Sequence, residues 1–366
     1  MWLLVLTTNI HSVYRVLDAF GRSGHPMAGG FFWAAPICTG SIAFNIAFTW
    51  NDEPELVERL VSFVPKPLQH MLYFCRGLDL VFTARAVYGI LGVAIIYTTM
   101  QHLSGNRSNC TSKHMEYYKL ESVADWLLAS RLSTQNTHLI SILRPLITPL
   151  LLLQTRLTNI PTILLFSALN KVLLWTHNSQ TTKGMSPTAT TLTSLLMAHL
   201  SYFALGGTNA ISSLDLSLAY NGIASYNAVM VGVLLFIGNW AGPIWWALAG
   251  LEAVLVSAQA RSSRWKTEQP KQANGDQTSD KAPAATSTGM NDHSKQKITA
   301  YIEHTTLLTL FLACATLATM AACAVLRTHL FVWTVFSPKF LYAVAWLVGW
   351  HWMVNGVLGG VLVALD

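Results

Sequence analysis

Charged residues are scarce in this sequence. The chain has 366 residues, of which 23 are Lys or Arg and 17 are Asp or Glu, so that 11% of the chain is charged. A soluble domain carries about 25%. Hydrophobic residues make up 52% of the chain, and the mean hydropathy is +0.41. One modest core cannot bury so much apolar surface, so the composition excludes an ordinary soluble globule and predicts an all-α, polytopic transmembrane helical bundle.

A continuous basic surface is also missing. The formal net charge is +6, but the segment 261–297 alone holds seven basic and four acidic residues, which is half of that excess. The basic character therefore belongs to loops and one linker. A face for DNA or RNA needs clustered Lys and Arg, so nucleic acid is excluded as a partner.

The sequence lacks the motifs of metal and nucleophile chemistry. Its five cysteines show no CxxC spacing, which excludes a disulfide framework and a zinc-cysteine site. The histidines and acids form no HExxH, HxH or DxD cluster, and there is no GxSxG elbow or phosphate-binding GK[ST] loop. We therefore expect no catalytic residue, no metal site and no cofactor in this chain.

Long apolar runs set the expected architecture. Crossing about 30 Å of hydrocarbon takes roughly 20 apolar residues, and the runs of suitable length predict about nine spans, within a range of seven to eleven. They lie near 31–50, 80–100, 139–154, 160–177, 190–206, 224–240, 242–258, 304–326 and 340–364.

Three regions follow from this pattern. Residues 1–260 are predicted to form a membrane helical region with a lumenal or interfacial loop at 101–138. The segment 261–297 has only two large apolar residues and should be a disordered hydrophilic linker. Residues 298–366 are predicted to form the C-terminal transmembrane helices.

The loop 101–138 contains two adjacent glycosylation sequons, which begin at Asn106 and Asn109. Basic residues near predicted span ends concentrate on the side that holds 51–79 and the linker, which indicates that this side is cytoplasmic. The sequon loop would then face the lumen, where glycosylation occurs. The same count of spans places 206–227 on the cytoplasmic side.

Two cations inside predicted spans are candidates for binding lipid phosphate, because a charge in the membrane is costly and is usually functional. They are Arg144 and Lys171. The alternative is that both side chains extend to the interface or pair with carbonyls at helix ends. Their positions within several residues of a predicted span end favour this alternative.

The run GGTNAISSLDLSLAYNGIASYN, residues 206–227, is polar but carries one formal charge. It is too polar for lipid and too poor in charge for an ordinary exposed loop. Its neutral donors and acceptors suit a sugar or a lipid headgroup, and Asn209, Asp215 and Asn221 are the candidate binding residues. Equally, its Ser and Asn side chains could cap short helices.

Three segments carry a resemblance to a known family. They are GGTNAISSLDLSLAYNGIASYN, FIGNWAGPIWW at 236–246, and HLFVWTVFSPKFLYAVAW at 329–346. Together they resemble the C-terminal membrane region of the fungal GPI (glycosylphosphatidylinositol) ethanolamine phosphate transferases of the second type. The segment RVLDAFGRSGHPMAG at 15–29 resembles the family more loosely.

This resemblance implies a function at the endoplasmic reticulum membrane. Family enzymes have a lumenal phosphatase-like domain with a Thr nucleophile and two zinc ions, and they move phosphoethanolamine from phosphatidylethanolamine to a mannose of the GPI precursor. The expected partners are membrane lipids, these two lipid substrates, and a catalytic domain or a small membrane subunit. This chain is expected to begin after the phosphatase-like domain, so the zinc would lie outside it.

Two other classes of function remain open. A multi-pass lipid or solute transporter would show repeated halves with paired broken helices, and no internal repeat is visible. A noncatalytic membrane scaffold would bind an enzyme through its spans.

Overall fold

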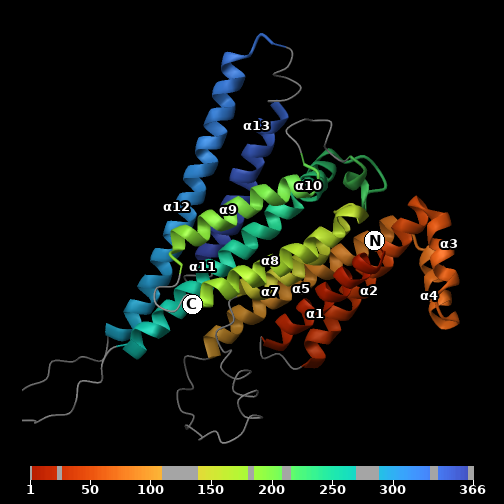
Figure 1. The fold of residues 1–366 in the computed structure, drawn as a ribbon, viewed down its shortest axis with the longest axis horizontal. Coiled ribbons are helices and arrows are strands. Elements are labelled where there is room, and N and C mark those ends of the chain that lie inside the picture. Colours follow the sequence, from red (N-terminus) through yellow and green to blue (C-terminus); the bar gives the residue numbers. More distant parts are fainter. Residues whose placement is uncertain are drawn as a thin grey trace, which may run out of the picture. The chain divides into compact units, whose positions relative to one another are not determined.

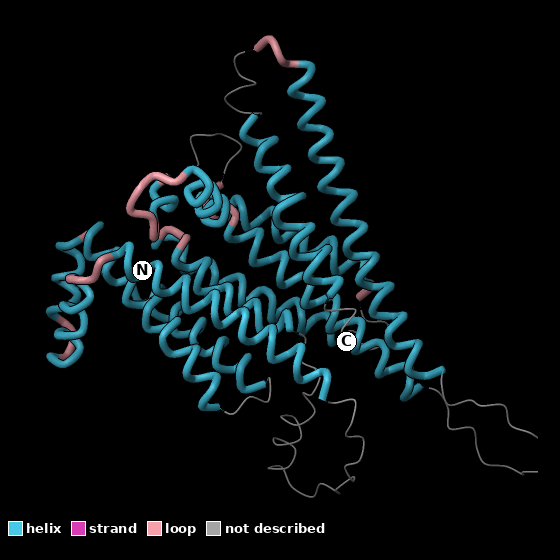
Figure 2. The backbone as a smooth tube through the Cα atoms, turned by 180° about the vertical axis from the view of Figure 1, so that it is seen from behind, coloured by secondary structure: helices cyan, strands magenta, loops and turns pink. Residues whose placement is uncertain are grey.

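The computed structural model describes residues 2–22, 27–108, 139–179, 185–207, 216–268, 288–329 and 337–361. Within these ranges the chain forms helices and connecting loops (Figure 2). The helices in the N-terminal half are α1 (Trp2–Arg22), α2 (Met27–Asp52), α3 (Pro54–Ser62), α4 (Lys66–Arg76), α5 (Leu80–Ser108), α7 (Leu139–Leu153), η1 (Leu157–Asn159) and α8 (Ile160–Ser179). They are followed by α9 (Pro187–Ala204), η3 (Ser217–Tyr220), α10 (Ala228–Asn239), α11 (Ala241–Glu268), α12 (Thr288–Val325), α13 (Ser337–Val344) and η5 (Ala345–Leu358). The all-helical membrane prediction therefore agrees with the described residues.

Helix boundaries follow local sequence signals. Asn227 caps α10, because its side-chain oxygen accepts from the backbone N–H groups of Val229 and Met230 at 3.1 and 3.2 Å. Gly206 follows the end of α9 with a φ of +86°, a conformation that glycine adopts without strain. Pro54 is the first residue of α3, where a missing N–H costs nothing.

Each of the nine predicted apolar runs overlaps a helix, but the count of nine spans is not confirmed. Five described helices are long and apolar enough to cross a membrane: Leu80–Met100, Leu157–Trp175, Ala241–Ala258, Gln296–Val325 and Lys339–Val361. The apolar helices α7 and α10 have 15 and 12 residues. At a rise of 1.5 Å per residue they reach about 22 and 18 Å, which is shorter than about 30 Å of hydrocarbon.

Helices also extend into predicted loops. α5 continues to Ser108, eight residues into the predicted loop 101–138. Helix α11 runs to Glu268 and α12 begins at Thr288, so both ends of the predicted linker 261–297 are helical. Residues 269–287 and 109–138 lie outside the described ranges.

The chain forms two compact units. The first comprises residues 1–169 and 198–246, and the second comprises 170–197 and 247–366. In the first unit α1, α2, α5 and α7 lie side by side (Figure 1). Their shared core contains residues from all four helices, namely Val16, Ile37, Leu91, Ala94, Ile142 and Leu146. This core fixes α1 against α7, which matters for the pocket described below.

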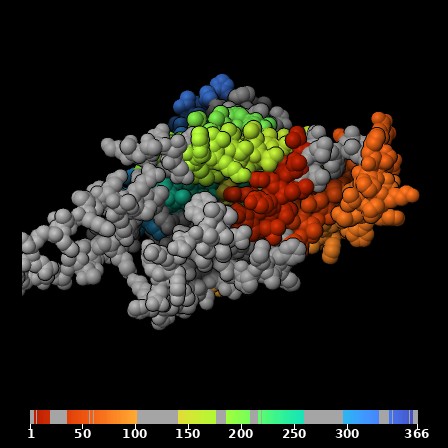
Figure 3. Space-filling view, turned by 60° about the horizontal axis from the view of Figure 1, so that its bottom comes forward, coloured from red at the N-terminus to blue at the C-terminus, as the bar shows by residue number. Residues whose placement is uncertain are grey.

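A helical hairpin of α3 and α4 packs against the end of α2. Trp50, Val57, Val61 and Cys75 form its buried centre, and Arg76 lies over the Trp50 ring at 5.7 Å from the ring centroid. The orange region that contains this hairpin projects at one edge of the first unit (Figure 3). It is a surface element, as expected from its short amphipathic helices.

In the second unit α12 packs against α13 and η5. Polar contacts join these apolar helices: the Tyr301 hydroxyl donates to the Asn355 carbonyl, and Thr309 lies 2.8 Å from His351 Nε2. His304 is buried and lies 2.8 Å from Thr191. Such bonds are common between helices in lipid, where an unsatisfied polar group is costly.

Candidate functional site

The polar loop at 216–227 is fastened to two helices of the first unit. The Asn221 side chain donates through Nδ2 to the backbone carbonyl of Leu153 at 3.0 Å. Leu153 is the last residue of α7, so its carbonyl lacks a partner within the helix. The Tyr88 hydroxyl of α5 donates to the Asn221 carbonyl at 3.1 Å. Asn221 therefore ties the loop to α5 and α7.

The next residue, Gly222, has a backbone that only glycine adopts easily. Its φ is +98°, and a Cβ there would lie 2.9 Å from Cε2 of Tyr88. Its carbonyl accepts a hydrogen bond from Nε of Arg85 at 2.8 Å. Arg85, a cation inside a predicted span, thus holds the loop through a charge-assisted bond.

A buried amide completes this junction. Nε2 of Gln154 donates to the Tyr88 hydroxyl, and Oε1 of Gln154 has no hydrogen-bond partner among the described residues. Sequence reasoning missed Tyr88 and Gln154 because both occur in apolar runs. The available signal was the spacing of Arg85 and Tyr88, which places two polar side chains on one helical face.

The loop presents aromatic and apolar side chains outward. Leu216, Tyr220 and Tyr226 are exposed. The arrangement can thus hold an uncharged polar loop in one conformation while part of its surface stays accessible. Asn209 and Asp215, the other two candidate binding residues in this loop, lie outside the described residues.

The two candidate cations have different environments. Arg144 lies on α7 and is 4% exposed, with its guanidinium carbon 5.1 Å from the centroid of the Trp245 ring. Arg144 is thus buried within the first unit. Lys171 lies on α8 and is exposed.

The remaining candidate positions concern metal ions and glycans. Among the described residues, no three His, Cys, Asp or Glu side chains come together as a group that could hold a metal ion. Asn106 lies in the last turn of α5, and Asn109 is outside the described residues.

Comparison with known proteins identifies similar sequences along the whole chain. A family model described as the GPI ethanolamine phosphate transferase membrane region matches residues 1–366. GPI ethanolamine phosphate transferase 2 of Aspergillus oryzae is 34% identical over 354 residues, which is 94% of this chain and 32% of that protein. The chain therefore spans about a third of the length of this relative.

Two further fungal proteins of that name are similar. The Aspergillus fumigatus protein is 44% identical over 171 residues, covering 47% of this chain and 17% of its own length. The Yarrowia lipolytica protein is 28% identical over 275 residues, covering 71% of this chain and 30% of its own length. No solved structure matches the chain.

Proposed function

The chain belongs to the GPI ethanolamine phosphate transferase membrane-region family, and we propose that it is the membrane module of such an enzyme. In this role it holds phosphatidylethanolamine and the GPI precursor while phosphoethanolamine is transferred to a mannose of the precursor. The chemistry is supplied by a phosphatase-like domain with two zinc ions, on the same or another polypeptide. The proposed location is the endoplasmic reticulum membrane.

The observation that carries this proposal is the family match over all 366 residues. A physical argument supports it: both substrates are lipids, so a membrane-embedded partner can restrict their position and orientation relative to the catalytic groups. Restricting the two reactants in this way can lower the activation free energy of the transfer by several kcal/mol. A small membrane subunit would fit the same assembly.

We also propose that the module crosses the membrane about nine times. The five long helices then pass through lipid together with α2, α7, α9 and α10. Of the two short helices, α7 is buried by its neighbours over most of its residues, as a segment too short to span the hydrocarbon requires. Arg144 and Lys171 are the cations proposed to contact lipid phosphate.

In this proposal the loop 206–227 faces the lumenal catalytic domain, which requires one span more or one span fewer before the loop than the nine-span count gives. The loop contributes to substrate positioning in two ways. Asn209 and Asp215 contact a headgroup or sugar hydroxyl. Asn221 acts as a positioning residue, because its side chain is already bonded to the Leu153 carbonyl. Removal of that bond frees the loop and leaves the carbonyl at the end of α7 unsatisfied.

The test uses a full-length family enzyme that carries this membrane region. Asn209→Ala and Asp215→Ala should each lower phosphoethanolamine transfer about tenfold at normal abundance, since one lost polar contact is worth about 1–3 kcal/mol. Asn221→Ala should lower abundance as well as transfer. Asn51→Ala, at an exposed position in the last turn of α2, is the matched control. Normal transfer in both Asn209→Ala and Asp215→Ala would remove the loop from substrate positioning.

A further inference from the structure

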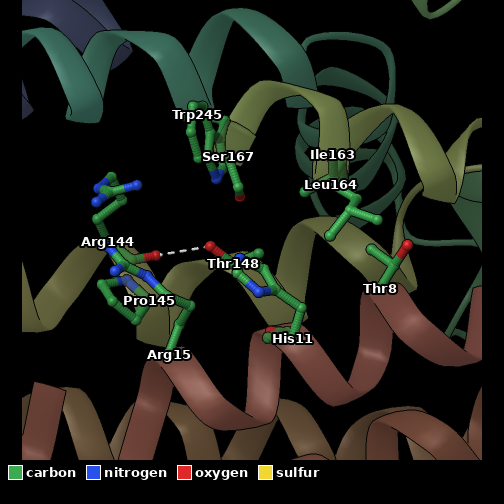
Figure 4. A pocket seen from close by; sticks show the side chains of 11 residues that line it. Thr8, His11, Arg15, Arg144, Pro145, Thr148, Ile163, Leu164, Ser167 and Trp245 are labelled. Carbon is green, nitrogen blue, oxygen red and sulfur yellow. Dashed lines mark hydrogen bonds between the residues drawn. The ribbon is translucent and has the colours of Figure 1, made fainter. Parts of the chain in front are cut away.

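A pocket in the first unit is lined by side chains from α1, α7 and α8 and by Trp245 near the start of α11 (Figure 4). α1 supplies His11 and Arg15, and α7 supplies Arg144. In Figure 4 the side chains of α1 rise toward α7, and Trp245 closes the opposite side. Helices from three separate parts of the sequence, α1, the consecutive α7 and α8, and α11, thus contribute to one site.

The charge of the lining has one sign. Two arginines and one histidine line the pocket, and none of the described residues of the lining is Asp or Glu. The carboxylate of Asp18 lies 4.0 Å from Arg15, and Asp18 is not part of the lining. The Trp245 ring attracts the Arg144 guanidinium through its π face, but this contact adds no negative charge. The lining therefore favours an anion.

A buried hydroxyl provides a second, independent indication of a ligand. Ser12 lines the pocket and is 6% exposed, and its Oγ has no hydrogen-bond partner among the described residues. Two other hydroxyls of the lining already donate within their helices: Thr8 donates to the Leu4 carbonyl at 2.6 Å, and Thr148 donates to the Arg144 carbonyl at 2.9 Å. A buried hydroxyl without a partner is costly, and an oxygen atom of a ligand would satisfy Ser12.

We propose that this pocket binds the phosphate group of a phospholipid headgroup. The planar guanidinium groups of Arg144 and Arg15 match phosphate oxygens in a bidentate manner, and Ser12 donates its hydroxyl to the same group. Ile163 and Leu164 give the pocket an apolar wall that suits the glycerol and acyl portion of a lipid. The identification of this lipid as a substrate rests on the proposed function, whereas phosphate binding does not.

The pocket is too small to admit a phosphate group unless some of its side chains move. Its free volume is about 10 Å³, which accommodates about one water molecule. His11 and Arg15 are only partly buried, as are Leu164 and Ser167, so these lining side chains can move aside, while the buried Arg144 and Ser12 stay in place. Binding thus requires Arg15 to turn from Asp18 toward the incoming phosphate.

The test measures binding to the purified full chain in a detergent that contains no phosphate. The probes are a short-chain phosphatidylethanolamine, a short-chain diacylglycerol that lacks the phosphate, and inorganic phosphate. The phosphatidylethanolamine should bind at least tenfold more tightly than either of the other two probes. If diacylglycerol binds equally tightly, phosphate is not recognised. If inorganic phosphate binds equally tightly, the pocket is a site for a free anion, and the lipid assignment falls.

Variants connect this binding to the pocket. Arg144→Gln should weaken phosphatidylethanolamine binding at least tenfold and Arg144→Lys less, because a lysine keeps the charge but loses the planar fork. Ser12→Ala should weaken it severalfold. Arg59→Gln, which changes an exposed arginine of α3, is the matched control and should bind normally.

Ser12→Ala keeps the inference testable even if Arg144→Gln fails to fold, since it removes only a hydroxyl without a protein partner. Normal binding by the Ser12→Ala variant together with normal binding by any folded Arg144 variant would overturn the inference. Phosphate-dependent binding by a chain that takes no part in transfer would overturn the proposed function and leave this inference intact.

Discussion

The guanidinium of Arg144 lies 5.1 Å from the centroid of the Trp245 ring, although the two residues are 101 positions apart in the sequence. Both side chains are almost completely buried. Desolvated cation–π contacts contribute about 2 kcal/mol, so Trp245 offsets part of the cost of placing a cation inside the first unit. Phe166 of α8 packs against the same indole at a centroid distance of 6.1 Å, which fixes the ring in place.

This relationship predicts a large effect of Trp245→Ala on stability. The indole is 1% exposed, and its truncation should cost about 3–5 kcal/mol, because it leaves a cavity and removes the cation–π contact. Trp175→Ala is the control, since that indole is 69% exposed. The apparent unfolding temperature of the purified chain in detergent is the measurement. Equal unfolding temperatures for the two variants would contradict the packing of Arg144 on Trp245.

Two Gly→Ala substitutions should have opposite effects on stability, one in the loop junction and one in a helix. Gly222→Ala should destabilise the chain by about 1–2 kcal/mol from the left-handed backbone alone, and its Cβ would also approach Tyr88 closely. Gly232→Ala should be neutral or stabilising by up to about 1 kcal/mol, because Gly232 lies within α10 and a Cβ there meets no atom within 4 Å. Unfolding temperatures of the two variants, measured side by side, decide between these outcomes. An unfolding temperature that Gly222→Ala leaves unchanged would show that the loop can be anchored without glycine at this position.

Glycosylation tests the predicted topology. If the loop 101–138 is lumenal, Asn106 or Asn109 should carry a glycan when it is far enough from the membrane. Endoglycosidase treatment should then increase electrophoretic mobility in the native chain and have no effect on the double Asn→Gln variant. Labelling of Cys110 by a reagent added to the cytoplasmic side of sealed microsomes would contradict a lumenal loop.

The sequence by itself determined the class of the protein and the approximate positions of its helices. Every predicted apolar run overlaps a helix, because the transfer of a segment into an apolar environment depends mainly on its own residues and on its length. The family resemblance was also accessible, since it rests on contiguous segments such as 206–227. The number of spans was less accessible, because α7 and α10 are shorter than the apolar runs that contain them.

Part of the pocket could have been recognised in the sequence. Thr8, His11, Ser12 and Arg15 are spaced at i, i+3, i+4 and i+7, which places four polar side chains on one face of α1. This pattern predicts a polar stripe on an otherwise apolar helix. It does not identify the helix that faces the stripe, so it could not associate these residues with Arg144.

Only the tertiary structure decided what Arg144 and Asn221 do. The local sequence around Arg144 allowed extension to the interface, and burial followed from residues of α1 and α11 that are about 100 or more positions away. Likewise, Asn221 could have faced a ligand, but its side chain bonds to the Leu153 carbonyl. Hydrogen bonds and cation–π contacts depend on distances between particular atoms, and helix packing sets those distances, whereas the partition of a helix into an apolar phase is largely a sum over its own residues.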